Sequence, residues 1–304
     1  MTDAQSILDK HLPRAGATDG NAEPQVGLFR GMSFDKYQAL PGLHKTSLHV
    51  MVAQTPAHYH YAITHPDETD TPAKRFGRLV HTMTLEPSVA DERYVVAPET
   101  APDGKPWDRR YKAHKEAWAA WAKANAGREI VDPAMMLRAA AMVSEVRGHR
   151  VAKDILADAE VELSVQWVDP GTQLVCKARP DVAKGCVLAD LKTCNTADPT
   201  RFPRDAYAYG YWFQAAFYLD GCRAVGLDVD TFCIIAVESD PPHCVAVYQL
   251  DPAEIELARA QYHGVLQQIV FWTKQGRWPG YSDELMDLVA PPYAGLELMS
   301  RMDA

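Results

Sequence analysis

The chain has 304 residues, 47% of them apolar, and a formal net charge of −9, so it can bury one large core. No stretch reaches the roughly 18 consecutive apolar residues of a membrane helix. The opening MTDAQSILDKHLPRA also lacks the basic start and apolar centre of a secretion signal, so we expect no membrane association and a cytoplasmic location.

The acidic balance argues against a nucleic-acid partner held across the whole surface, because phosphates are bound mainly by Lys and Arg. Basic residues nevertheless cluster in AKRFGR (73–78) and DRRYKAHK (108–115), which is compatible with a locally basic groove on an acidic protein. The six cysteines include no C-x-x-C pair. Their spacing argues against a zinc ribbon and gives no support for an iron–sulfur cluster.

The first residues are rich in Ala, Gly, Asp and Pro. We expect residues 1–28 to form a flexible tail and residues 29–304 to form a single domain. Ser33 and Ser47 are candidate helix N-caps, and Pro56 suits the first turn of a helix over AHYHYAI. A further helix is expected over KRFGRLVHTMTL, followed by a short strand, RYVVAP.

Aromatic residues recur with a helical period between residues 105 and 125. Trp107, Tyr111, His114, Trp118 and Trp121 follow one another at spacings of four and three. Such a stripe more often packs in a core. The alternative is a surface that stacks on nucleobases or wedges open a duplex end.

After a second helix, over PAMMLRAAAMVSEVRGH, the pattern changes to strands. VELSVQWV, TQLVCKARPDVA and CVLADLKT predict a three-stranded meander with two-residue turns at Pro170-Gly171 and Lys184-Gly185. A helix over YGYWFQAAFYLDGCRA, strands TFCIIAVES and CVAVYQL, and a long helix from Pro252 follow. This order predicts an α/β fold with a central mixed β-sheet flanked by helices.

Polar residues interrupt the apolar third strand of the meander. Because strand side chains alternate between faces, Asp190 and Lys192 share one face and Leu191 points to the other. A buried carboxylate needs a neutralising partner, and hard oxygen ligands suit Mg²⁺ or Mn²⁺. A lysine beside such an ion could stabilise charge on a phosphate. The simpler alternative is a structural Asp–Lys ion pair.

The two predicted turns set the register of the meander. They place Arg179 opposite Asp190, Asp181 opposite Leu188, and Glu162 opposite Arg179. Asp181 and Asp190 would then be diagonal neighbours, about 7 Å apart at the backbone, and could converge on one ion. A turn longer by one residue would break this convergence.

Pro180-Asp181 followed by Asp190-Leu191-Lys192 in an apolar strand resembles the PD-(D/E)XK nuclease motif. Further motifs resemble the RecE-type (exodeoxyribonuclease VIII-like) exonucleases of phages and prophages, in the order MSFDKYQALPGLHKTSLHVM, TPAHYHYA, FGRLVHTMTLEP with Gly77-x-x-x-His81, Glu162, Gln214-x-x-x-Tyr218 and RWPGYSDEL. The resemblance covers roughly residues 29–295. Each motif is weak alone, whereas their common order is fairly specific.

The resemblance implies a PD-(D/E)XK nuclease fold with a metal site. Asp181 and Asp190 would bind Mg²⁺, for which Mn²⁺ would substitute, together with the backbone carbonyl of Leu191. His81 and Glu162 would complete or orient this site.

The resemblance also implies catalytic roles around the metal. Lys192, positioned by Gln214 and Tyr218, would activate or steer the attacking water. Glu160 has the same strand parity as Glu162 and is an alternative to it.

The implied activity is a Mg²⁺-dependent exodeoxyribonuclease that degrades linear double-stranded DNA from its 5′ ends and leaves 3′ single-stranded tails for recombination. The implied partners are double-stranded DNA ends, a single-strand annealing protein of RecT type, and further copies of the chain in a homo-oligomeric ring. Two alternatives are a non-catalytic module that binds DNA ends or the annealing protein, and a nuclease specific for single strands.

Overall fold

The described structure includes residues just before the predicted domain boundary at residue 29. The computed structural model describes residues 26–66, 69–108 and 110–290, so residues 1–25 of the predicted tail lie outside the described residues. Strand β1 (Gly27–Phe29) already pairs with β5 (Ser164–Val168), which places residues 27 and 28 in the domain. No helix in the described ranges is long and apolar enough to cross a membrane.

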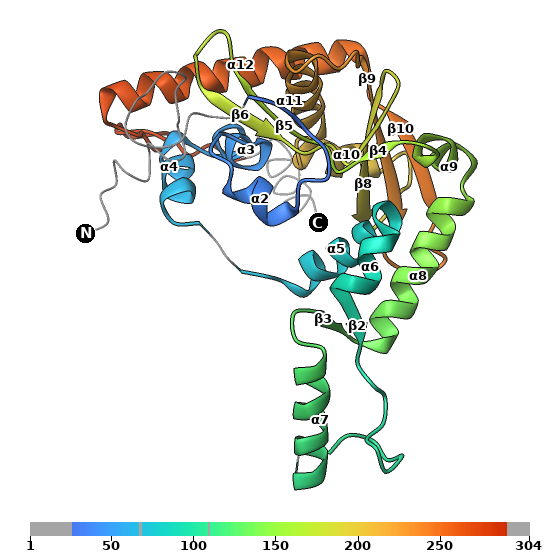
Figure 1. The fold of residues 1–304 in the computed structure, drawn as a ribbon. Helices are drawn as coiled ribbons and strands as arrows, with labels where there is room; N and C mark the ends of the chain where they lie inside the picture. The colour runs from blue at the N-terminus through green and yellow to red at the C-terminus, as the bar shows by residue number, and fades with distance from the viewer. Residues whose placement is uncertain (1–25, 67–68, 109, 291–304) are drawn as a thin grey trace, which may run out of the picture.

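The centre of the fold is a five-stranded mixed sheet, as predicted (Figure 1). β8 and β9 run parallel and the other neighbours are antiparallel. The strands of this sheet, in spatial order, are β10 (Val245–Gln249), β9 (Thr231–Glu238), β8 (Val187–Cys194), β7 (Val182–Lys184) and β4 (Glu160–Val161). β9 is almost continuously apolar, as expected for a strand covered on both faces, whereas Asp190 and Lys192 interrupt the apolar run of β8.

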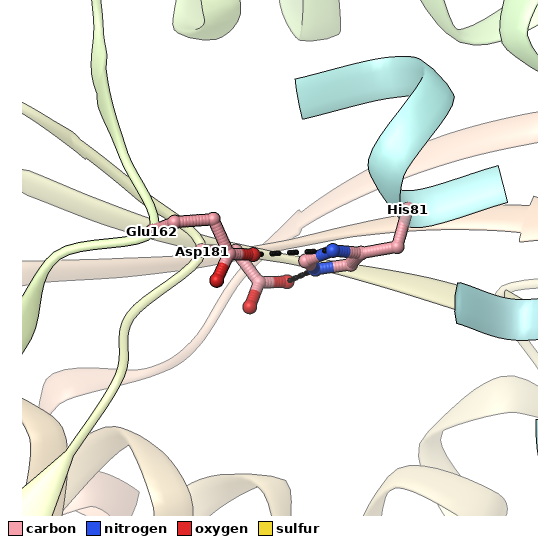
Figure 2. Close-up of side chains that lie close together, drawn as sticks. All are labelled: His81, Glu162 and Asp181. Carbon is pink, nitrogen blue, oxygen red and sulfur yellow. Dashed lines mark ion pairs between the residues drawn. The ribbon is translucent and has the colours of Figure 1, made fainter. Parts of the chain in front are cut away.

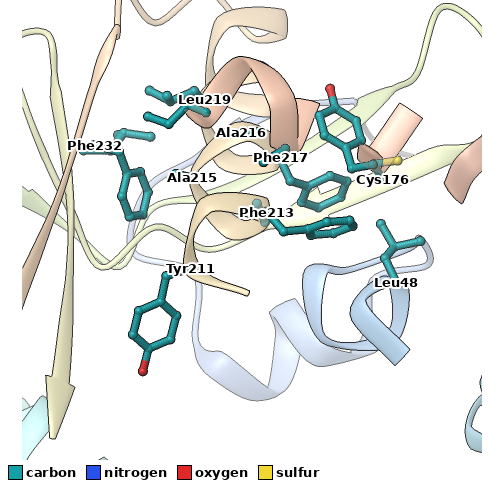
Figure 3. Packing of buried hydrophobic residues seen from close by; sticks show 14 of the residues in the cluster. Leu48, Cys176, Tyr211, Phe213, Ala215, Ala216, Phe217, Leu219 and Phe232 are labelled. Carbon is teal, nitrogen blue, oxygen red and sulfur yellow. The ribbon is translucent and has the colours of Figure 1, made fainter. Parts of the chain in front are cut away.

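Helices cover the two faces of this sheet with separate apolar clusters. Phe232 and Ile234 pack on the α11 side, whereas Cys233 and Ile235 pack on the α5 and α8 side. Figure 3 shows the first cluster around α11. The covering helices are α5 (Pro72–Leu85) and α8 (Pro133–Gly148) on one face, and α11 (Tyr211–Ala224) with α12 (Pro252–Gln275) on the other.

Local capping residues set several of the predicted helix starts. Ser33 caps α2, and Pro56 lies in the first turn of α4, where its missing N–H costs nothing. The predicted cap at Ser47 is wrong, because α3 begins at Lys45 and Ser47 lies in its first turn. The shorter helices are α2 (Phe34–Ala39), α3 (Lys45–Ala53), α4 (Pro56–Thr64), α6 (Pro87–Arg93), α9 (Arg150–Leu156) and α10 (Phe202–Ala208).

The predicted three-stranded meander is wrong, because its first two strands each divide between two sheets. β4 joins the central sheet, and β5 continues into a three-stranded sheet of order β1-β5-β6. The return strand divides in the same way, into β6 (Val175–Ala178) and β7. At the break, Glu162 has φ +54°, a left-handed conformation that a strand cannot contain and that costs a non-glycine residue roughly 1–3 kcal/mol.

Both predicted registers are also wrong, each by two residues. Gly185, with φ +55°, takes the first rather than the second turn position, so Lys184 pairs with Val187. In the other hairpin the Asp169 carboxylate accepts hydrogen bonds from the N–H and Oγ1 of Thr172, which stabilises a longer loop. A shift of two residues keeps every side chain on its predicted face.

The aromatic stripe belongs to a projecting part of the chain. Helix α7 (Lys112–Ala124) lies between β2 (Tyr94–Val96) and β3 (Glu129–Val131) and extends away from the sheet in Figure 1. Trp107 precedes the helix, and with Trp118 and Trp121 it is only half-buried and outside both apolar clusters. The interpretation of this stripe as core is therefore wrong.

The close contact between Gly221 of α11 and Trp167 of β5 allows the packing around α11 to be tested by mutation. Gly221 faces the buried Trp167 of β5, and a Cβ added there would lie 2.5 Å from the indole ring. We expect Gly221→Ala to lower the free energy of unfolding by up to about 2 kcal/mol, because the overpacking cost of about 1–3 kcal/mol exceeds the gain of about 1 kcal/mol in helix propensity. Urea denaturation measures this change.

Gly264→Ala is the matched control, because it lies inside α12 with no atom within 4 Å of the added Cβ. It should leave the stability unchanged or raise it by up to about 1 kcal/mol. Equal stability changes in the two variants would contradict the packing argument.

Candidate active site

Three of the predicted metal ligands meet where the strands break (Figure 2). His81, on α5, lies with Nε2 2.9 Å from Asp181 Oδ2 and with Nδ1 3.2 Å from Glu162 Oε1. One ligand atom from each of the three residues lies within 4.8 Å of the others. The left-handed turn at Glu162 and the end of β6 before Asp181 bring these carboxylates to the imidazole from one side.

The register shift places Asp181 closer to Asp190 than predicted. The observed pairing of Val182 with Ala189 puts Asp181 directly across from Asp190, not diagonal to it. Asp181 Oδ2 also accepts a hydrogen bond of 2.8 Å from the Leu191 N–H, and the N–H of Glu162 donates to the Asp181 carbonyl at 2.9 Å. Backbone contacts therefore hold both sides of the break together.

Asp190 lies beside this group under helix α11 and is only 2% exposed. Its Oδ2 is 2.5 Å from Lys192 Nζ, and its Oδ1 accepts a hydrogen bond from Gln214 Nε2. Gln214 Oε1 is 3.4 Å from the same ammonium group. Asp190, Lys192 and Gln214 therefore form one polar group, which brings Gln214 to the lysine beside which the resemblance places it.

Two other predicted residues, Tyr218 and Leu191, border this group. Tyr218 lies one turn after Gln214, and burial, followed by the charges of nearby groups that include Asp190, raises the pKa of its hydroxyl. Leu191 contributes its N–H to Asp181, while the ligand role of its carbonyl stays a prediction.

Arg179 neutralises one of the three carboxylates. Its Nε donates to Glu162 Oε2, and its Nη1 donates to Ser164 Oγ at 2.6 Å and to the Met32 carbonyl at 2.9 Å. The alternative residue, Glu160, pairs instead with Arg30 at the surface. The structure therefore brings Glu162, not Glu160, to the site.

The two carboxylates give His81 an unusual proton affinity. Burial by itself lowers the pKa of the imidazole, but Asp181 and then Glu162 raise it to about 9. His81 is therefore protonated at neutral pH in the metal-free protein.

The buried acids themselves differ in proton affinity. Burial, followed by the charge of Asp181, raises the pKa of Asp190. Burial also acts to raise the pKa of Asp181, but His81, Lys192 and the Leu191 N–H outweigh it and lower that pKa. The protein thus keeps Asp181 ionised, which suits a metal ligand.

The residues present fit a divalent metal ion. Oxygen and imidazole ligands converge at His81, Glu162 and Asp181, and the buried Asp190 Oδ2 has no aligned hydrogen bond within the described residues. Lys192 Nζ forms an ion pair with that oxygen, but the angles of the contact do not suit a hydrogen bond. An ion at this position would give Asp190 Oδ2 the partner that it lacks among the described residues.

Sequence reasoning missed two residues that border the site. Lys45 Nζ donates to the Tyr209 carbonyl at 2.5 Å and lies 6.0 Å from the Tyr211 ring centroid, while Lys192 Nζ lies 5.0 Å from the same centroid. Burial, followed by the charge of Lys192, lowers the pKa of Lys45 to about 8. No carboxylate in the described part of the chain forms an ion pair with Lys45, and no spacing in the sequence connects it to Lys192.

This sheet, with Asp181, Asp190 and Lys192 at its centre, defines a domain of the PD-(D/E)XK nuclease superfamily. The family described as "PDDEXK-like domain of unknown function (DUF3799)" matches residues 46–288, which is more than half of the chain. The chain belongs to this family.

Solved structures match the chain at low sequence identity. One from Eubacterium rectale, provisionally described as an exonuclease, matches with a TM-score of 0.50 and 12% identity over 85% of this chain and 93% of its own. The structure of SSO0001 matches at 15% identity over 62% of this chain and 85% of its own, with a TM-score of only 0.26. No curated protein matches the chain.

Metal binding should release a proton from His81. A metal ion binds the deprotonated imidazole, whereas the pKa of about 9 keeps His81 protonated at pH 7 in the metal-free protein. We expect Mn²⁺ binding to release about one proton and to weaken as the pH falls. Isothermal titration calorimetry in two buffers of different ionisation enthalpy measures the release.

His81→Gln is the control variant, because it removes the titrating group and retains polar atoms. Its proton release should be smaller by about one proton. Identical binding enthalpies for the unmodified protein in both buffers would contradict the prediction.

Proposed function

We propose that this protein is a metal-dependent exodeoxyribonuclease that degrades linear double-stranded DNA from its 5′ ends and leaves 3′ single-stranded tails for recombination by strand annealing. The observation that carries the proposal is the convergence of Asp181, Asp190 and Lys192 with His81 and Glu162 in one buried polar site.

Two further lines of support agree with a nuclease. The chain belongs to a PDDEXK-like family, and a structure of similar fold is provisionally described as an exonuclease. The duplex preference and the 5′ to 3′ direction are supported by the resemblance of the sequence motifs to RecE-type exonucleases.

The proposed reaction is hydrolysis of a phosphodiester bond. A Mg²⁺ ion held by Asp181, Asp190, the Leu191 carbonyl, His81 and Glu162 would supply a Lewis acid for the phosphate oxygens, and Mn²⁺ would substitute for it. The water oxygen attacks phosphorus, the 3′ oxygen leaves and takes up a proton, and the product carries a 5′ phosphate.

Protein side chains position the reactants for this attack. The Lys192 ammonium group orients the water and offsets the negative charge that develops on the phosphate. Gln214 binds both Asp190 and Lys192, so it holds the cation in place, and Tyr218 lies near enough for the charges of Asp190 and Asp181 to act on its hydroxyl.

Lys45 would provide a second cation for the substrate. It is partly buried beside Lys192 without a carboxylate partner in the described ranges, and a phosphate of the DNA backbone would supply the missing negative charge.

The resemblance also supports the proposed assembly. The protein would act on double-stranded DNA ends as a homo-oligomeric ring, in the cytoplasm, together with a single-strand annealing protein of RecT type.

End-labelled DNA tests the reaction directly. With Mg²⁺, linear duplex DNA should release a 5′ label early and a 3′ label late, and EDTA should stop the release. Lys192→Ala should lower the rate by roughly 10²- to 10³-fold, because the developing charge loses its closest cation.

A thermal melt of Lys192→Ala shows that any loss of activity is not a loss of fold. Intact duplex that is still bound would favour the non-catalytic alternative. Digestion limited to single strands would favour a single-strand nuclease in place of the proposed one.

The second cation has a separate test. Lys45→Ala should raise the KM for DNA and lower kcat/KM by roughly 10-fold or more, whereas Lys45→Arg should recover part of this loss because it keeps the charge. Lys274→Ala, an exposed lysine at the end of α12, is the matched control. Unchanged kinetics in Lys45→Ala would contradict a phosphate contact.

A further inference from the structure

The projecting part of the chain is attached to the helix that carries His81. We call residues 97–128, which connect β2 to β3 and contain α7, the arm. Figure 1 shows α7 extending away from the helices that cover the central sheet. At the base of the arm, the Tyr94 hydroxyl lies 3.5 Å from Thr82 Oγ1, and Thr82 follows His81 directly on α5. The strand that leads into the arm therefore packs against α5, the helix that carries His81.

Three tryptophans of the arm pack mainly on one another. The Trp107 and Trp118 rings meet edge to face at 5.2 Å, and Trp118 and Trp121 are also 5.2 Å apart. Trp107 Nε1 donates to the Pro98 carbonyl at 2.7 Å, which fixes its orientation. Because all three rings remain partly exposed, this cluster is an apolar surface that folding has left accessible.

Two of the tryptophans, Trp107 and Trp118, line a hollow of about 660 Å³. Trp107, His114 and Trp118 form one wall, and Pro98 and Pro133 also line it. This volume is within the range of about 300–1,000 Å³ that is usual for sites of small organic groups. Flat apolar walls of this kind suit planar aromatic rings.

The acidic residues that line the hollow favour a nucleobase over a phosphate as its occupant. Glu99 and Asp132 line it, so they would repel a phosphate but can accept hydrogen bonds from the amino groups of nucleobases. The outer surface has the opposite sign. Residues 110–128 contain five Lys or Arg and a single acid, Glu116, in a chain with a net charge of −9.

Two of these cations are available for a partner. Lys115, at the edge of the hollow, and Lys123, two turns further along α7, are both exposed and have no ion pair within the described ranges. A single strand of DNA combines the two matching features, since it presents unstacked bases and a phosphate backbone.

We propose that the arm binds single-stranded DNA, with a base stacked in the Trp107–Trp118 hollow and phosphates at Lys115 and Lys123. This inference rests on the proposed DNA substrate. While the active site cleaves one strand of the duplex, the arm would bind the other strand and hold it near α5.

The test measures binding without cleavage. Full-length protein in EDTA is titrated with a fluorescently labelled single-stranded oligothymidylate, and anisotropy and tryptophan quenching are recorded across a range of salt concentrations. The variants are Trp118→Ala, Trp118→Phe and the double variant Lys115→Gln with Lys123→Gln. Phe271→Ala, an exposed aromatic residue on α12, is the matched control.

Trp118→Ala should weaken binding by about 5- to 150-fold, and Trp118→Phe should recover most of it, because stacking needs only an aromatic face. The double lysine variant should reduce the slope of log affinity against log salt by about 1.4, since each phosphate contact on a single strand contributes about 0.7. The lysines are exposed, so this variant tests the proposal even if Trp118→Ala does not fold.

The proposal is overturned if the Trp118→Ala variant and the double lysine variant both bind single-stranded DNA with the affinity and salt slope of the wild type. A protein partner would then be the better candidate for the hollow. This outcome is separate from failure of the proposed function, because binding is measured in EDTA while cleavage is measured with Mg²⁺. Arm variants that cleave duplex DNA and bind single-stranded DNA normally would contradict the proposal for the arm and leave the proposed function intact.

Discussion

The burial of Asp190 is the interaction on which the site depends most. A carboxylate that is 2% exposed is stable only with charged or hydrogen-bonding partners, and Asp190 has Lys192 on its own strand and Gln214 on α11. Phe213 and Phe217, on either side of Gln214, are buried against the sheet. The apolar packing of α11 therefore fixes the position of the amide that donates to Asp190 Oδ1, so the packing of the core also positions the site.

The break in two neighbouring strands is the second constraint. A continuous hairpin would direct Glu162 and Asp181 along the regular pleat of one sheet, whereas the change of sheet at these residues turns both carboxylates toward His81. The left-handed backbone at Glu162 is strained, and its cost is offset by the hydrogen bond to the Asp181 carbonyl and by the ion pair with Arg179. Strain of this kind is typical of functional sites, where the direction of a side chain matters more than local stability.

Charge is distributed unevenly over this acidic chain. Cations gather at two places, beside the candidate active site, where Lys45 and Lys192 share the Tyr211 ring, and along the outer surface of α7. The net charge of −9 therefore says little about the local surfaces that a polyanion would meet, because the field at short range follows the nearest groups. Acidic groups elsewhere would limit nonspecific binding to nucleic acid.

The sequence alone determined which residues share a face, because side-chain alternation is a local property that survives a register error of two residues. It therefore predicted Asp190 beside Lys192 and grouped them with Asp181 correctly. Only the tertiary structure decided the register, the division of the hairpin between two sheets and the approach of Lys45, because loop geometry and helix packing depend on residues distant in the chain. The helical period likewise identified α7, but burial of its tryptophans depended on what packs against them, and they lie outside both apolar clusters of the described residues.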